Sequence, residues 1–296
     1  MFKPFRQIMG FNLSSFNRIG TPLLAVLATT YVIMETLRPL RQRKAPRRQR
    51  WKTNAGVALV GLTGLKLALL PGLVVCAKAS QKYNIGLLHH VKCPTWLKLM
   101  LSFLLLDYGN YAWHVLNHRY SFLWRLHQVH HLDVDLDVTT AWRFHLGEIL
   151  ASVIFRGGVV TVTGVKPAHV LQYELFYEAA TAFHHSNWRL PFRFEKILTR
   201  ILVTPRMHGI HHSICEKESN SNFAVIFSIW DRLHQSMCLN VPQQSIIVGH
   251  PAYLDAQEQT VAFLLALPFS PTRLWQQPNS YKANRQIINS PFSLVP

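Results

Sequence analysis

Runs of apolar residues separated by short polar segments dominate the first part of the chain. Three of these runs, at 21–37, 55–76 and 95–113, come close to the length of about 20 residues that a helix needs to cross a bilayer. Lys66 interrupts the second run, which is still long enough to span. The pattern therefore predicts membrane-spanning helices before residue 114.

Two further apolar segments, 147–165 and 167–183, contain polar residues. They are expected to form a helical hairpin that turns near Lys166 and Pro167. The hairpin either spans the bilayer or dips in and returns, and its polar groups must face protein because lipid cannot satisfy them. With the earlier runs, this gives about four membrane-embedded helical segments.

The remaining sequence is more polar and is expected to lie outside the bilayer at 188–250. The run 259–269 is too short to span and is expected to be interfacial or part of a core. The first residues lack a compact apolar core with a small-residue cleavage site, so no signal peptide is expected. We expect four regions: an N-terminal interfacial segment at 1–20, transmembrane helices at 21–113, a catalytic domain at 114–250 and a C-terminal tail at 251–296.

Composition and charge support a membrane protein. The chain is 49% hydrophobic and 15% charged, whereas soluble domains carry about 25% charged residues. Its net charge of +17 is concentrated in 38–52, where eight Lys and Arg lie between two apolar runs. Such a loop stays in the cytoplasm under the positive-inside rule. Anionic headgroups are the expected partner and nucleic acid is not, because no recognition motif accompanies the charge.

This loop fixes the topology of the other segments. The second run leaves the cytoplasm and the third returns, which brings His114 and His118 to the cytoplasmic end of the third helix. The hairpin returns His184 and His185 to the same side. The prediction is an all-α integral membrane protein whose histidine clusters lie in a cytoplasmic helical cap.

Eight of the 16 histidines form three dense clusters. Helical positions i and i+4 share one face, as do i and i+3, so each cluster can aim several imidazoles at one point. Neutral imidazole is a ligand for iron, zinc, copper and nickel. The clusters are H-x3-H at 114–118, H-x2-HH at 127–131 and H-x2-HH at 208–212.

The number of histidines favours two metals over one. A single zinc or iron needs three or four protein ligands, and the clusters with His185 supply more. A di-zinc membrane hydrolase acting on a lipid ester or amide is the alternative, although no H-E-x-x-H base is present. A haem protein is disfavoured because the histidines crowd outside the bilayer. The four cysteines form no C-x-x-C pair and are expected to be isolated thiols.

Other polar residues are expected to have ordinary roles. Isolated histidines are usually satisfied core or surface groups, and an alternating Asp run is usually a solvated loop. His184 is expected to be a non-ligand beside His185. The remaining residues of this kind are His89, His90, His169, His234, His250, Asp133, Asp135 and Asp137.

The clusters and their flanking sequence resemble the fatty acid hydroxylase/sterol desaturase superfamily. The resemblance runs from about residue 35 to 235 and is specific for the superfamily, not for a substrate. It is carried by RQRWKTNAGVAL (48–59), LLLDYGNYAWHVLNHRYSFLWRLHQVHH (104–131), DLDVTTAWRFHLGEILAS (135–152), FHHSN (183–187), MHGIHHS (207–213) and SNFAVIFSIWDRL (221–233).

The resemblance implies a di-iron, O2-dependent membrane enzyme that hydroxylates or desaturates a lipid C–H bond. No electron-transfer domain is expected in 236–296, so the electron donor is external. The implied iron ligands are His114, His118, His127, His130, His131, His185, His208, His211 and His212. The residues expected to orient these imidazoles are Asp107, Arg143, His145, Glu148, Asn222 and Asp231, with an ion pair near the headgroups as the alternative for Arg143 and Asp231.

Overall fold

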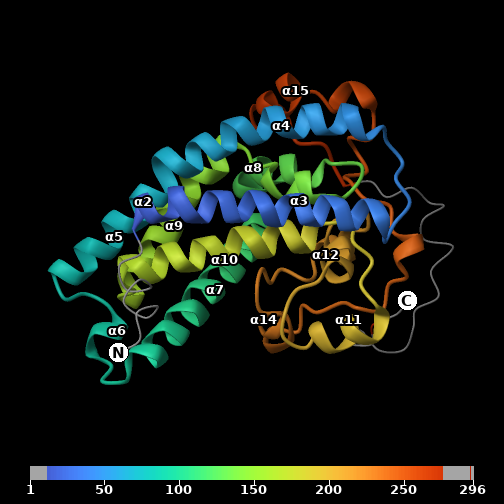
Figure 1. The fold of residues 1–296 in the computed structure, drawn as a ribbon. Helices are drawn as coiled ribbons and strands as arrows, with labels where there is room; N and C mark the ends of the chain where they lie inside the picture. The colour runs from blue at the N-terminus through green and yellow to red at the C-terminus, as the bar shows by residue number, and fades with distance from the viewer. Residues whose placement is uncertain (1–11, 276–293, 295–296) are drawn as a thin grey trace.

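The computed structural model describes residues 12–275 and residue 294, and this part of the chain is helical without strands (Figure 1). The all-α prediction is therefore confirmed. The main helices are α3 (Thr21–Leu37), α4 (Arg47–Gly64), α5 (Leu70–Lys82), α7 (Thr95–Arg119), α8 (Ser121–His131), α9 (Leu146–Thr163) and α10 (Pro167–His185). Shorter helices are α2 (Leu13–Ser15), α6 (Leu87–His90), α11 (Phe192–Leu198), α12 (Pro205–His211), α13 (Glu216–Ser219), α14 (Ile229–Leu233) and α15 (Val261–Ala266).

The first two helical segments are longer than the apolar runs. Helix α2 continues through the π-helical turn η1 (Phe16–Gly20) into α3, so residues 13–20 belong to the first long helix. The boundary expected at residue 20 therefore does not coincide with a helix end, and residues 1–11 of the expected interfacial segment lie outside the described part. Helix α4 begins at Arg47, so the predicted loop 38–52 ends at residue 46.

The second long helix contains a local irregularity. Helices α4 and α5 are joined by the π-helical turn η2 (Leu65–Leu69), and Pro71 follows at the start of α5. Proline has no N–H and its ring clashes with the carbonyl four residues earlier, so the chain widens there. The helix from Arg47 to Lys82 is about 54 Å long at 1.5 Å per residue, which exceeds a bilayer core.

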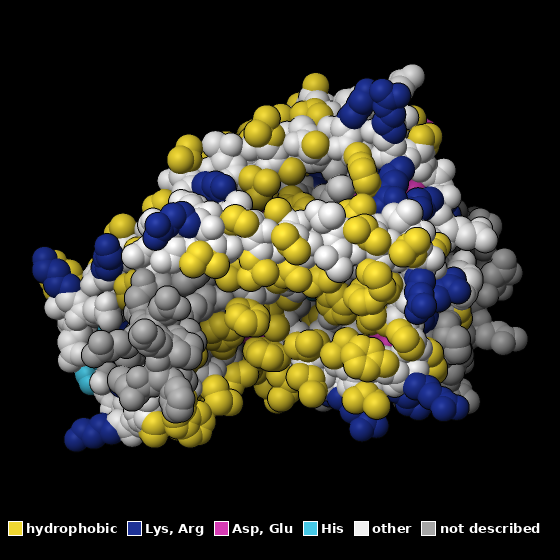
Figure 2. All heavy atoms as spheres, viewed as in Figure 1, with side chains coloured by type: hydrophobic (Ala, Val, Ile, Leu, Met, Phe, Trp, Pro, Cys, Tyr) yellow, Lys and Arg dark blue, Asp and Glu magenta, His cyan; other side chains and the backbone are white. Residues whose placement is uncertain are grey.

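Three helical segments are long and apolar enough to cross a membrane: Leu13–Leu37, Arg47–His90 and Leu146–Thr163. About four membrane-embedded segments are expected from the sequence. Helices α7 and α10 are not among the three, and both bury acidic groups such as Asp107 and Glu174 against protein. Figure 2 shows hydrophobic side chains over α3 and α10, with Lys and Arg gathered near the loop between α3 and α4 and near α11.

The hairpin predicted for 147–183 is confirmed. Helix α9 ends at Thr163, and Gly164 adopts the left-handed conformation with φ of 73°. A side chain there would also meet the backbone of Gly86 about 3.1 Å away. Proline at the first position of α10 supplies a φ suited to a helix start. The two helices therefore reverse direction at Lys166, as expected.

The segment 259–269 forms part of a core and is not a free tail. Helix α15 and the 3-10 turn η6 (Leu267–Phe269) pack against α4 and α8. Leu264 and Leu267 are buried with Val57, Val129 and Leu132. The C-terminal part of the described chain therefore covers the elements that carry the second histidine cluster.

The three alternating aspartates are buried, so the prediction of a solvated loop is wrong. Arg50 of α4 donates to both carboxylate oxygens of Asp133, at 2.8 and 2.7 Å, and to Asp137 at 2.7 Å. Asp135 accepts backbone N–H groups from the loop before α4. Because these charged groups are buried, removing one of them would leave its partner as an uncompensated buried charge. The guanidinium therefore fixes the N-terminal end of α4 to the segment that follows α8.

Arg50→Leu is expected to destabilise the protein strongly, because it leaves two buried carboxylates without their cation. The free energy of unfolding should fall by about 3–5 kcal/mol. The matched control is Arg48→Leu, since Arg48 lies on the same turn and is exposed. Thermal unfolding in detergent tests both, and equal midpoints for the two variants would contradict the role of Arg50.

Candidate metal centre

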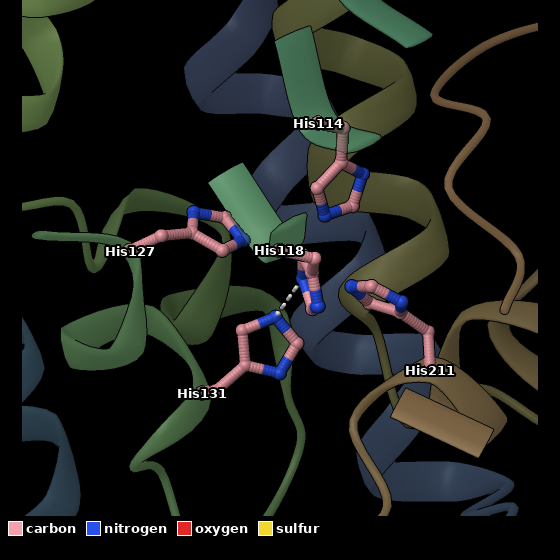
Figure 3. A group of neighbouring side chains, drawn as sticks. All are labelled: His114, His118, His127, His131 and His211. Atoms are coloured by element: carbon pink, nitrogen blue, oxygen red, sulfur yellow. Dashed lines mark hydrogen bonds between the residues drawn. The ribbon is translucent and has the colours of Figure 1, made fainter. Parts of the chain in front are cut away.

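Nine imidazoles from α7, α8, α10 and α12 gather in two neighbouring groups, and they are the nine predicted ligands. Within each group, the nearest ligand atoms all lie within 4.8 Å of one another. Figure 3 shows five of the rings converging from different elements. The five-histidine group is His114, His118, His127, His131 and His211; the four-histidine group is His130, His185, His208 and His212.

Within each cluster, the division of the histidines between the two groups follows their helical spacing. In α7 the i and i+4 pair His114 and His118 belongs to the five-histidine group. In the second cluster the i and i+4 positions join this group, and the i+3 position, His130, joins the other. In the third cluster the i and i+4 positions join the four-histidine group, and His211 joins the first. Each H-x2-HH cluster therefore contributes to both groups, as a pair of adjacent metals requires.

Hydrogen bonds fix which ring nitrogen faces inward. The Nδ1 atom of His114 lies 2.7 Å from the carbonyl oxygen of Phe223. His127 places Nδ1 2.9 Å from Oε1 of Glu148. Carbonyl and carboxylate oxygens accept, so Nδ1 of each ring carries the proton and donates it. This leaves a lone pair on Nε2, the form that binds a metal.

The same tether recurs in both groups. His211 donates from Nδ1 to the carbonyl of Ser221, and His185 donates to that of Thr181, each at 2.7 Å. Every residue has a backbone carbonyl that can accept a hydrogen bond, so no sequence motif identifies the carbonyls that do so here. The tethers depend on where the chain passes, which is set by the fold.

Three inward nitrogens of the five-histidine group lack partners in the described part of the chain, whereas Nε2 of His118 and Nε2 of His131 lie 3.1 Å apart. The Nε2 atoms of His114, His127 and His211 are buried and make no hydrogen bond. A buried polar atom without a partner is costly, and three of them facing one another are explained by a cation between them. The residues therefore fit a metal ion on chemistry as well as on spacing.

The four-histidine group converges even more closely. Nε2 of His185 lies 2.9 Å from Nε2 of both His130 and His208. Nε2 of His212 lies 3.1 Å from Nε2 of His208. Because Nδ1 of His185 donates to a carbonyl, its Nε2 brings a lone pair to this point. Several lone pairs directed at one centre are the donor set of a metal site.

Burial keeps five of the clustered histidines neutral. Desolvation lowers the pKa of each well below its ordinary value near 6.5, and the neighbouring imidazoles lower it further. Neutral imidazole is the metal-binding form. The histidines outside the membrane helices that behave this way are His130, His131, His208, His211 and His212.

His184 belongs to neither group. Its Nδ1 lies 3.1 Å from the carbonyl of Val225, and its ring centroid lies 4.1 Å from that of His208. The isolated histidines also lie outside both groups; His169, for example, bonds to the hydroxyl of Ser102 at 2.9 Å. The four cysteines are free, as expected.

Among the six residues expected to orient the imidazoles, Glu148 contacts one directly. Its Oε1 accepts from His127 and, at 3.2 Å, from the amide of Asn117. Asp107 and Asp231 act instead through the backbone of the segment before α14. Asp231 accepts the N–H groups of Phe223 and Ala224, which positions the carbonyl that receives the proton of His114.

Asp107 holds the other end of this segment. It accepts the backbone N–H of Phe227 at 3.0 Å and the indole N–H of Trp230 at 2.8 Å. Asn222 bonds to the carbonyls of Met207 and Cys238, which ties the segment to α12. These groups therefore place the backbone acceptors and do not touch the imidazoles themselves.

Arg143 and His145 hold the turn between α8 and α9. Arg143 is fully buried and donates to the carbonyl of Val129 and to Asn54. His145 accepts the N–H of Gly147 and caps α9. Both Asp231 and Arg143 are buried; Arg143 lies 3.6 Å from Asp133 in an ion pair, and Asp231 accepts backbone N–H groups.

The ring of Phe144 was not among the predicted site residues. It stacks on His130 with centroids 4.6 Å apart and an angle of 7° between the planes. Trp124 packs against His118 and His131 on the other side. An aromatic residue near a histidine cluster carries no distinct sequence signal, so only the tertiary structure shows that Phe144 and Trp124 pack against the histidines.

A cavity of about 840 Å³, including its open mouth, reaches the histidines from the membrane helices. Its walls come from α4, α7, α9 and α10 and are mainly apolar, with Leu62, Leu65 and Ile149 among them. Histidines from both groups, His114 and His130 among them, form one end. An apolar lining with a few polar groups is typical of a site for a small-molecule ligand.

Comparison with known proteins finds similarity to one family over part of the chain. The fatty acid hydroxylase family model matches residues 99–236. The chain is 24% identical to rat cholesterol 25-hydroxylase over 66% of its length. It is 31% identical to ornithine lipid hydroxylase OlsE of Rhizobium tropici and 30% identical to human alkylglycerol monooxygenase, each over 47% of its length. No solved structure matches.

The chain spans 70%, 41% and 29% of these three relatives, in the order given. The family match begins in α7 and ends after α14, so it contains all nine clustered histidines and the hairpin. The resemblance inferred from the sequence is confirmed: residues 99–236 match the fatty acid hydroxylase family.

Proposed function

We propose that this chain is a membrane-bound, O2-dependent di-iron oxidoreductase that hydroxylates or desaturates a lipid C–H bond. One observation carries the proposal: two adjacent groups of buried imidazoles, with Nε2 lone pairs turned inward, lie at the end of a largely apolar cavity. The named hydroxylases and monooxygenases among its relatives support this class of reaction.

The nine clustered histidines are the proposed ligands, five for one iron and four for the other. Two iron ions held there would supply activation of O2 and removal of hydrogen from an unactivated carbon, which side chains cannot perform. Zinc is not redox-active, so the alternative of a di-zinc hydrolase does not account for relatives named as hydroxylases.

The protein's own groups hold the site and the substrate. Glu148 and three backbone carbonyls keep protons on Nδ1 of four rings, which holds each of these four in one orientation. The apolar walls take up a lipid and exclude bulk water. Holding the lipid against the histidine end of the cavity sets which carbon is modified, because reaction requires close and aligned contact.

The orientation in the membrane and the redox partner are part of the proposal. The Arg-rich loop before α4 lies next to the end of α10, where Pro39 pairs with Trp188. The histidines of α10 are at this same end. Positive charge favours the cytoplasmic side, so we place the metal centre in the cytoplasm. An external donor supplies the electrons there.

Purified protein is expected to contain about two iron ions per chain, one for each histidine group. His211→Ala and His185→Ala should each lower the iron content to about one, because each removes a ligand from a different group. His90→Ala is the matched control, since His90 is exposed and outside both groups. Metal analysis by mass spectrometry measures this; stoichiometric zinc with no iron-dependent turnover would overturn the di-iron proposal.

Glu148→Leu is expected to weaken iron binding about 10–100-fold, as loss of a group that orients a metal-bound histidine usually does. Glu148→Gln should weaken it less, because the amide oxygen still accepts from His127. Glu216→Leu is the control, since Glu216 is exposed. Iron release to a chelator measures the affinity, and equal release from all variants would contradict the role of Glu148.

The reaction itself is tested by lipid profiling of cells that express the wild type or His130→Ala. The wild type should yield a lipid that has gained one oxygen atom or lost two hydrogen atoms. Under 18O2 the gained oxygen should carry the label. A lipid cleaved at an ester or amide without O2, and no oxidised lipid, would exclude the proposed oxidoreductase.

A further inference from the structure

The cavity contains polar groups that the metal centre does not use. On α10, Glu174, Glu178 and Thr181 lie on the face that also carries His185, at spacings of four, three and four residues. Arg156 of α9 donates to Glu174 and lies 5.0 Å from the ring of Tyr177. Charged groups within membrane helices are costly and usually serve a function.

The free atoms among these groups are mainly hydrogen-bond acceptors. Among the residues that line the cavity, Oε2 of Glu148, Oδ1 of Asn117 and the hydroxyl oxygen of Thr181 are buried without partners. The amide of Asn117 is oriented by its donation to Glu148, so its oxygen is the free end. Trp142 donates to Oε2 of Glu178 at 2.9 Å, and no described residue bonds to its Oε1. The cavity therefore needs a ligand that donates.

Charge in the cavity disfavours an ionic headgroup. Glu148 and Glu178 both line the walls, which opposes a carboxylate or phosphate. Arg156 also lines the walls, but its guanidinium is already paired with Glu174. An uncharged donor such as a hydroxyl satisfies the free acceptors without adding a charge.

Resting on the proposed function, we propose that the substrate is a lipid with a free hydroxyl group, which donates to the Glu178 carboxyl while its apolar skeleton extends to the histidines. Glu178 lies seven residues before His185, a separation of about 10 Å along a helix. The hydroxyl therefore binds at a distance from the carbon that reacts. Glu178 is a specificity-determining residue in this arrangement.

Equilibrium binding of radiolabelled probes tests this without turnover. The full chain, loaded with iron, is placed in phosphatidylcholine nanodiscs, and empty nanodiscs are subtracted. One pair of probes is hexadecanol and hexadecanoate, and the other is cholesterol and cholesterol sulfate. In at least one pair, the hydroxyl probe should bind about tenfold more tightly, the ratio expected for one hydrogen bond to a carboxyl group.

Glu178→Leu should abolish this preference, and Glu178→Gln should keep most of it, since the amide oxygen still accepts. Phe176→Leu is the matched control, because Phe176 lies two residues away and points outward, 59% exposed. Thermal unfolding and iron content confirm that each variant is folded. If Glu178→Leu does not fold, binding of the two probe pairs to the wild type and to Glu178→Gln still tests the proposal.

Two outcomes would overturn the proposal: no preference for the hydroxyl probe in either pair, or a preference that survives in Glu178→Leu. Tighter binding of hexadecylamine than of hexadecanol would also overturn it, in favour of a cationic lipid. Failure here is separate from failure of the proposed reaction, because iron content and 18O incorporation are measured independently.

Discussion

The tether of four imidazoles through Nδ1 is the interaction on which the site depends. A neutral histidine can present either nitrogen, and the acceptor beside Nδ1 decides which one turns inward. Glu148 does this for His127, and carbonyls do it for His114, His185 and His211. Without these acceptors, the same clusters would present a mixture of donors and lone pairs, and two metal positions would not be defined.

The tethers in turn require that the surrounding backbone stay fixed. Asp107 and Asp231 bind N–H groups along one segment and thereby place the carbonyl that receives the proton of His114. Arg50 and Asp133 fix the segment after α8 to α4. Such buried groups are costly to desolvate, and removing one member leaves its partner uncompensated. We infer that they are retained because they position the site.

The cavity joins the apolar and the ionic parts of the protein. Apolar side chains from several elements, Leu62 and Ile149 among them, line part of it, whereas one end is formed by imidazoles and another part by Glu178 and Arg156. A lipid in this space would contact a hydrocarbon-like wall along its length and polar groups at defined points. Recognition by a few placed polar groups in an apolar pocket is the usual basis of ligand specificity.

The sequence by itself determined the helical class, the hairpin turn at Lys166 and the nine clustered histidines, because hydrophobic runs and i, i+4 spacing are local properties. It could not determine the division into groups of five and four, since that depends on how four helices cross. It also missed the burial of Asp133 and the tethers to backbone carbonyls, because distant segments supply both. The sequence shows that Asp133 carries a charge, whereas only the tertiary structure shows that its partner is Arg50 and not water.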